Sequence, residues 1–265
     1  NQKLIIMTAK FVSALCVIFL MAGCSGSDKA ENWTHFRGSQ MDGHAQTETA
    51  PLEWSENSNV VWKTEVKGKG YSSPVIYGNQ IWITSATDDG KEFYTLCYDF
   101  ETGELLDEKT IFTSDDPQRI HSTNSYATPT SCIEDGFVYP HFGTFGTACI
   151  DTKTFDVVWK REDLTCDHMQ GPASSPVIYK DKLVVHLEGT EDPYVVALNK
   201  TTGETIWNSV RPKEIYDPLE PVYRKSYQTP IVINVEGKDL LISNSSFMCF
   251  AHDVYTGEVI WTFEY

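Results

Sequence analysis

The sequence predicts an all-β protein made of repeated four-stranded sheets, and three observations support this fold class. Four segments begin alike, with their prolines 47 to 55 residues apart: Tyr71–Pro74, Tyr126–Pro129, Ala173–Pro176 and Tyr227–Pro230. A second landmark follows each proline by 22 to 25 residues, at Asp99, Asp151, Asn199 and Asp253. No segment after the N-terminal leader shows a sustained helical period. Two landmarks that recur together are typical of a repeat architecture.

Each unit contains the pattern of four short strands. The first strand is expected directly after the proline, because a proline at a strand start has no ladder donor to lose. The second is a β-branched and aromatic run, expected at residues 81–84, 137–139, 183–185 and 240–242. The third alternates large and small side chains, so that Cys97, Cys149, Ala197 and Ala251 share the small face.

A tight turn leads from the third strand to the fourth. It contains Gly103, Gly203 and Gly257, which suit a backbone conformation of positive φ. The fourth strand then carries a tryptophan in three units: Trp159, Trp207 and Trp261. We expect each tryptophan to wedge between neighbouring sheets, where the small residue of the third strand leaves room. Radial stacking of such sheets is a β-propeller.

The end of each unit resembles the eleven-residue tryptophan-docking motif of quinoprotein propellers, A-x-D-x-x-x-G-x-x-x-W. The fourth unit matches completely, through Ala251, Asp253, Gly257 and Trp261. The third unit has Asn199 at the acidic position. The second keeps Asp151 and Trp159 but has Cys149 and Phe155 for Ala and Gly, and the first keeps Asp99 and Gly103 but has Cys97 and Asp107 for Ala and Trp. The chain thus resembles the pyrroloquinoline-quinone (PQQ)-like propeller family, particularly its lipoprotein branch. That branch is similar to the β-propeller lipoprotein of the outer-membrane barrel-assembly machinery.

The resemblance covers residues 33–265: an opening segment, 33–70, then blades that begin near residues 71, 126, 173 and 227. Residues 60–66 are expected to add an outer strand. Family propellers have seven or eight blades, which at ~50 residues each need roughly 350–400 residues. Four units therefore predict either an incomplete ring, as in a fragment, or an array that closes by another route.

The first residues have the features of a lipoprotein signal. A basic start and an apolar run of about a dozen residues end at Met21–Cys24. This pattern resembles the bacterial lipobox, which implies a signal peptide at residues 1–23, lipidation of Cys24 and a flexible tether at 24–32. The predicted location is the bacterial cell envelope, with the lipid as membrane anchor; an ordinary secretory signal is the alternative.

The charge balance excludes one class of partner. With 37 acidic and 21 basic side chains, the net charge is −16. Nucleic-acid binders need a basic footprint to neutralise phosphates, and none is visible.

Cysteine and histidine residues offer only weak signs of a site. Cys97 and Cys149 are expected to be small buried hydrophobes. Cys166 and His168 are a pair of metal-ligand types, but no second pair follows at metal-ligand spacing, so no metal is predicted. His141 and His186 are expected to be solvated or core residues. The acidic stretch from Glu188 to Asp192 is expected to be a hydrated hairpin tip or a weak calcium loop.

The segments before the first strands are the best candidate for a binding site. In a propeller, loops that lead into the innermost strands surround the channel mouth. Five residues of these segments can bind a sugar or a peptide there: Tyr71, Tyr126, Tyr227, His121 and Arg224. The alternative is that the tyrosine hydroxyls tie neighbouring blades together.

Three functions follow as hypotheses. The first is a non-catalytic envelope lipoprotein that binds a protein partner. The second, implied by the resemblance, is a PQQ-dependent dehydrogenase whose catalytic residues lie outside this chain. Family dehydrogenases use PQQ, calcium, an Asp base and a disulfide between adjacent cysteines, and no two cysteines are adjacent here. No catalytic residue and no cofactor are therefore assigned. The third is a binder of carbohydrate or another small ligand at the channel mouth.

Overall fold

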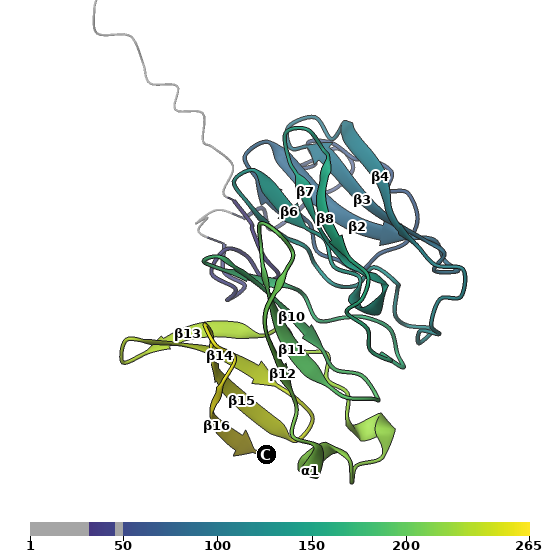
Figure 1. Ribbon diagram of the computed structural model, residues 1–265. Coiled ribbons are helices and arrows are strands. Elements are labelled where there is room, and N and C mark those ends of the chain that lie inside the picture. The colour runs from purple at the N-terminus through teal and green to yellow at the C-terminus, as the bar shows by residue number, and fades with distance from the viewer. Residues whose placement is uncertain (1–31, 46–49) are drawn as a thin grey trace, which may run out of the picture. The chain divides into compact units, whose positions relative to one another are not determined.

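Four antiparallel four-stranded sheets make up the fold (Figure 1). The computed structural model describes residues 32–45 and 50–265. In every sheet the strands follow one another in chain order, as the hairpin pattern of the sequence requires. The structure therefore confirms an all-β fold of four-stranded blades.

The strand bounds define the four blades. Blade 1 holds β1 (Val75–Tyr77), β2 (Gln80–Ala86), β3 (Glu92–Asp99) and β4 (Leu105–Thr113). Blade 2 holds β5 (Cys132–Glu134), β6 (Phe137–Tyr139), β7 (Thr147–Asp151) and β8 (Val157–Arg161). Blade 3 holds β9 (Val177–Tyr179), β10 (Lys182–Leu187), β11 (Tyr194–Asn199) and β12 (Thr205–Val210). Blade 4 holds β13 (Ile231–Val235), β14 (Lys238–Asn244), β15 (Met248–Asp253) and β16 (Val259–Glu264).

In the described residues, helical structure is confined to short turns between strands. These are the 3-10 turns η1 (Gly143–Phe145) and η2 (Pro221–Tyr223) and the single-turn helix α1 (Lys213–Tyr216). Within residues 32–45 and 50–265, no helix has both the length and the apolar character needed to cross a membrane.

The two ends of the blades differ. Tight turns such as 100–104 and 254–258 lie at one end, which we call the turn end. The other end carries the connections between blades, residues 114–131, 162–176 and 211–230, together with the β14–β15 turn at 245–247. We call it the connection end. The alternation of strand direction places the candidate channel-mouth residues at the connection end.

A row of four cross-strand neighbours on one face of each blade meets the next blade. In blade 3 the row is Val177, Val184, Ala197 and Trp207, all buried in a cluster with Leu241 and Val254 of blade 4. The corresponding row of blade 2 is Cys132, Tyr139, Cys149 and Trp159, which packs with blade 3. Cys149 in this row of blade 2 and Cys97 in the equivalent row of blade 1 are buried thiols, because only a small side chain leaves space for an aromatic ring across the sheet.

Trp159 and Trp207 each lie on the turn glycine of the following blade. A Cβ atom on Gly203 would lie 2.7 Å from the ring of Trp159, and one on Gly257 would lie 2.6 Å from the ring of Trp207. The indole N–H of each ring donates to a carbonyl three residues before that glycine, Lys200 at 2.9 Å and Val254 at 3.1 Å. The contact therefore needs both the absent side chain and a free carbonyl.

The opening segment supplies the same contact to blade 1. The indole of Trp62 lies on Gly103 and donates to the carbonyl of Phe100 at 2.9 Å. Residues 60–66 nevertheless form no strand, so the expected outer strand is wrong. In the described part of the chain, no neighbouring strand pairs with this segment.

Blade 1 presents its aromatic residue from a different strand. Its row is Val75, Trp82, Cys97 and Asp107, so the large ring comes from the second strand and the fourth strand carries a carboxylate. At the facing turn, blade 2 has Phe155 at positive φ where the other blades have glycine. The rings of Trp82 and Phe155 lie 5.8 Å apart. Both halves of the motif thus change together.

A chain of hydroxyl groups links all four blades just before their first strands. The backbone N–H of Ser73 donates to Thr130 Oγ1 at 2.9 Å, that of Thr130 to Ser175 Oγ at 3.0 Å, and that of Ser175 to Thr229 Oγ1 at 3.0 Å. These four residues each lie two positions before their strand.

The first strand of blade 2 begins two residues later than the repeat pattern predicts. β1, β9 and β13 begin directly after a proline, but β5 begins at Cys132, three residues after Pro129. The extra residues form a local turn, in which Asn124 Oδ1 accepts from the N–H of Ser125 and the hydroxyl of Thr128. Tyr126 is therefore two residues further from its strand than Tyr71 or Tyr227.

The leader, the lipidation site Cys24 and most of the tether at 24–32 lie outside the described residues, so these expectations stay predictions.

In blade 4, the docking row ends on Trp261, which is 42% exposed, whereas the equivalent Trp207 is 7% exposed beneath blade 4.

Candidate functional site

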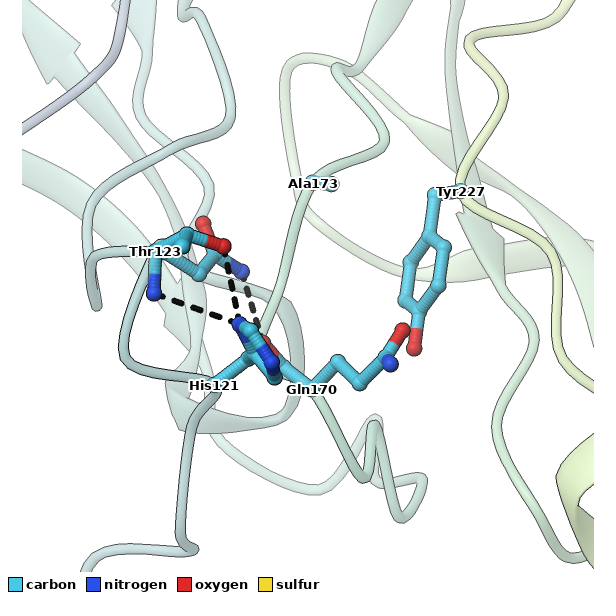
Figure 2. Close-up of a pocket in the computed structure, with 6 residues that line it drawn as sticks. His121, Thr123, Gln170, Ala173 and Tyr227 are labelled. Carbon is cyan, nitrogen blue, oxygen red and sulfur yellow. Dashed lines mark hydrogen bonds between the residues drawn. The ribbon is translucent and has the colours of Figure 1, made fainter.

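A cavity at the connection end brings together two of the five predicted binding residues. It has a volume of about 350 Å³ and is lined by His121, Thr123, Asn124, Gln170, Ala173 and Tyr227. These residues come from the connections into blades 2, 3 and 4. Figure 2 shows His121 and Thr123 on one side, Tyr227 on the other and the Gln170 side chain extending toward the Tyr227 ring.

Hydrogen bonds hold the His121 side of the cavity in place. The backbone N–H of Thr123 donates to His121 Nδ1 at 3.2 Å, and the Thr123 hydroxyl lies 2.8 Å from the same nitrogen. A ring nitrogen that accepts a backbone N–H carries no proton, so the neutral ring is protonated at Nε2. Asn124 Nδ2 donates to the carbonyl of Gln170 at 2.8 Å, which joins the two connections. His121 Nδ1 is thus occupied as an acceptor, which leaves Nε2 as the donor of the ring.

Tyr227 forms the aromatic wall of the cavity. Its hydroxyl donates to the carbonyl of His168 at 2.9 Å, so the ring lies back over the connection that leads into blade 3. Burial raises the pKa of its hydroxyl well above the usual range. This bond ties blade 4 to the preceding connection, which is the alternative role considered for the tyrosines.

The other three predicted residues lie elsewhere. Tyr126 is buried, packs edge-on against Phe93 and donates to the carbonyl of Gln118 at 3.0 Å. Tyr71 is exposed beside Lys69. The Arg224 guanidinium donates to two nearby carbonyls and borders a separate hollow with Glu191 and Asp192. The predicted ring of tyrosines is therefore not one site.

A narrow, polar space adjoins the cavity and contains three buried histidines: His141, His168 and His186. Burial lowers the pKa of His168 to about 4. Burial, together with the neighbouring His168, lowers the pKa of His141 to about 3. Both rings are neutral at neutral pH, as expected for core residues.

The Cys166–His168 pair has the geometry of a packed pair rather than of a metal site. Cys166 Sγ lies 3.3 Å from His168 Nδ1, while His168 Nε2 accepts the N–H of Thr144 at 2.9 Å. Burial raises the pKa of the thiol far above its usual range, so it stays protonated. Within the described ranges, no three His, Cys, Asp or Glu side chains are grouped so that they could hold a metal ion.

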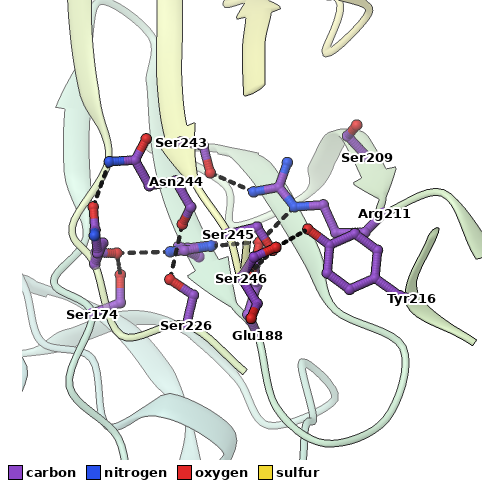
Figure 3. A network of polar contacts seen from close by, with 12 residues as sticks. Ser174, Glu188, Ser209, Arg211, Tyr216, Ser226, Ser243, Asn244, Ser245 and Ser246 are labelled. Atoms are coloured by element: carbon purple, nitrogen blue, oxygen red, sulfur yellow. Dashed lines mark hydrogen bonds and ion pairs between the residues drawn. The ribbon is translucent and has the colours of Figure 1, made fainter. Parts of the chain in front are cut away.

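A buried charge network behind this space was not expected from the sequence. Glu188 and Arg211 form an ion pair at the boundary of blades 3 and 4 (Figure 3). His186 Nε2 lies 2.7 Å from Glu188 Oε1, but the two atoms are not aligned as a hydrogen bond. Burial alone would raise the pKa of Glu188, but the charge of Arg211 lowers it below its usual value. The expectation of a hydrated acidic tip was therefore wrong for Glu188.

Arg211 extends the network from blade 3 to blade 4. Its guanidinium donates to the Ser243 hydroxyl and to His252 Nε2, the latter at 3.0 Å, and lies 4.2 Å from the centre of the Phe250 ring. Breaking a buried pair of this kind leaves an uncompensated charge. Neither residue stands out in the sequence: Glu188 directly follows β10 and Arg211 directly follows β12, and only the packing of the strands brings them together.

Comparisons with known proteins identify the family. A family profile of PQQ-type repeats, described as "Outer membrane protein assembly factor BamB", matches residues 45–264. The chain belongs to this family. Among curated proteins, it is 30% identical over 141 residues to quinoprotein ethanol dehydrogenase of Pseudomonas putida, which is 49% of this chain and 21% of that one.

Solved structures of the same fold come from both kinds of relative. BamB from Moraxella catarrhalis has a TM-score of 0.50 at 13% identity, over 77% of this chain and 55% of that one. Quinohemoprotein alcohol dehydrogenase from Comamonas testosteroni has a TM-score of 0.54 at 15% identity, over 74% and 35%. At these identities the likeness concerns the fold. The chain spans about a fifth of the curated relative and 35% to 55% of these two structures.

The residues present do not fit the quinone and calcium of a dehydrogenase. No carboxylate lines the cavity, and the carboxylate of the adjoining space, Glu188, is already paired with Arg211. No two cysteines are adjacent in the sequence. We therefore assign no catalytic step to these residues.

Proposed function

We propose that this protein is a non-catalytic scaffold of the bacterial cell envelope that binds a protein partner through its connection end. The observation that carries the proposal is a pair of exposed apolar side chains held in strained backbone. Met169 and Phe247 have φ of 59° and 61° and are 45% and 46% exposed. A non-glycine residue in this conformation costs about 1–2 kcal/mol, and such strain clusters at functional sites.

The surroundings of these residues suit protein recognition. Tyr223, 53% exposed, lies with its ring centre 6.5 Å from that of Phe247. Met169 directly precedes Gln170, which lines the cavity beside Tyr227. Exposed aromatic and methionine side chains beside polar donors are the composition of protein interfaces. The family description, an outer membrane protein assembly factor, agrees with a recognition role.

Site-specific photo-crosslinking tests this proposal. A benzoylphenylalanine at Met169 or Tyr223 is expected to form a covalent adduct with an envelope protein. The matched control is Tyr255, an aromatic residue of the turn end that is 41% exposed. Equal crosslinking from Tyr255, or none from the connection end, would overturn the proposal.

We further propose that Cys24 carries the lipid that holds the protein at the membrane. The lipobox-like sequence Met21–Cys24 supports this anchor. In fractionated bacteria, Cys24→Ser is expected to move the protein from the membrane to the soluble fraction. Unchanged fractionation would contradict it.

A dehydrogenase is the second candidate, because the local identity to quinoprotein ethanol dehydrogenase is 30%. Calorimetric titration of the protein with PQQ and calcium, followed by a dye-linked alcohol oxidation assay, separates the two. The scaffold proposal expects no saturable binding. Binding with turnover would favour the enzyme.

A further inference from the structure

The cavity occupies a place where the neighbouring blade holds a tyrosine. Tyr227 and Ala173 both lie four residues before the first strand of their blades. The ring of Tyr227 extends back over the connection into blade 3 and bonds to the carbonyl of His168. Ala173 has no ring, and the corresponding space lies over the connection into blade 2. That connection supplies His121, Thr123 and Asn124 to the cavity.

The size and lining of the cavity limit the size and charge of a ligand that fits it. At about 350 Å³ it lies at the small end of the range of ligand pockets, ~300–1,000 Å³, and suits a single ring. None of its six lining residues is a carboxylate, a lysine or an arginine, so the lining offers no ion-pair partner to a charged group. The Tyr227 ring offers an aromatic wall and Ala173 a small apolar one.

The polar groups of the cavity match a hydroxyl. His121 presents a donor at Nε2, because Nδ1 already accepts from Thr123. The side-chain amide of Gln170 provides both a donor and an acceptor. A phenol hydroxyl both donates and accepts, and its ring can pack against Tyr227 edge to face.

We propose that this cavity receives the tyrosine side chain of a partner protein, in the way that blade 3 receives Tyr227. The inference rests on the proposed recognition function and names the residue type that anchors the partner. The exposed Met169, beside Gln170, provides apolar surface for the rest of the segment.

Ligand titration by nuclear magnetic resonance, with N-acetyl-L-tyrosinamide as the probe, tests the proposal. We expect saturable shifts, with an affinity on the order of millimolar for one side chain. Ala173→Tyr fills the cavity with the protein's own ring and is expected to abolish the shifts. Lys153→Tyr, which adds a tyrosine at the exposed turn end, is the control and leaves them unchanged.

Two further measurements define the chemistry. N-acetyl-L-phenylalaninamide lacks the hydroxyl and is expected to bind about two- to tenfold more weakly, the effect of one hydrogen bond. His121→Leu removes the donor and is expected to eliminate this difference, which keeps the test available if Ala173→Tyr does not fold.

Three outcomes would overturn the proposal. They are equal binding by the wild type and a folded Ala173→Tyr variant, no binding by the wild type, and displacement of the probe by methyl α-D-glucopyranoside at lower concentration. Crosslinking from Met169 that survives Ala173→Tyr would reject the tyrosine anchor while leaving the scaffold function in place.

Discussion

Single glycines decide how the blades of this protein meet. Gly203 has φ of 76° and lies directly under the ring of Trp159, so it meets two requirements at once: a left-handed backbone and no side chain. Gly78 has φ of 58° but no atom within 4 Å of the place of a Cβ. It therefore meets only the backbone requirement. Comparing Gly203 with Gly78 therefore separates the cost of backbone strain from the cost of a clash with the docked tryptophan.

We predict that Gly203→Ala destabilises the protein more than Gly78→Ala. The backbone alone costs about 1–2 kcal/mol in each variant. The methyl group at 203 also overlaps the indole at 2.7 Å, which adds about 1–3 kcal/mol of overpacking. Urea denaturation of both variants measures the difference. Equal losses of stability would show that Trp159 moves aside freely.

At the scale of elements, the contact between blades 1 and 2 exchanges large and small residues. Asp107 stands where other blades have the docking tryptophan, and Phe155 stands where they have glycine. The ring that fills the contact comes from Trp82 on β2. Burial raises the pKa of Asp107, since one carboxylate oxygen is buried without a partner. This contact is therefore a different solution to the same packing problem.

We predict a favourable coupling between Asp107→Trp and Phe155→Gly. Alone, the new tryptophan overpacks at a cost of about 1–3 kcal/mol. Loss of the partly buried Phe155 ring costs less than the about 3–5 kcal/mol of a fully buried ring, because glycine also relieves the positive-φ strain at this position. Together they restore the ordinary tryptophan–glycine contact, with a coupling of about 0.5–3 kcal/mol. A double-mutant cycle by chemical denaturation measures it. Strictly additive effects would refute the exchange.

At the scale of the whole molecule, the blade contacts bury several neutral histidines. Burial lowers the pKa of His35, His168 and His252 to about 4 and that of His141 to about 3. For His252 the nearby charge of Arg211 adds to the effect. The unfolded chain binds protons near pH ~6.5, well before the folded one. Acid therefore favours the unfolded state.

We predict that stability changes little between pH ~7.5 and ~8 and falls as the pH drops below ~7 toward ~4. Four such groups remove up to about 5 kcal/mol between pH ~7.5 and ~5.5. Urea unfolding across this range measures the slope. His141→Gln should reduce this slope by about one proton. His44→Gln, at a side chain that is 85% exposed, is the control. A flat profile would contradict the prediction.

The sequence by itself determined the repeat, the four strands of each blade and the place of the turns. These features rest on local periodicity and on turn residues, and both are properties of short segments. The relation of Trp207 to Gly257 was visible for the same reason, as a fixed spacing within one motif. Family membership followed from that motif.

Only the tertiary structure decided which side chains share a site. Tyr126 and Tyr227 look alike in the sequence, but a two-residue shift in blade 2 turns the first into the core, while the second forms a wall of the cavity. Glu188 and Arg211 lie 23 positions apart and pair only because β10 and β12 end at the same side of blade 3. Such contacts depend on how separate strands and connections pack, because no local pattern encodes the distance between them.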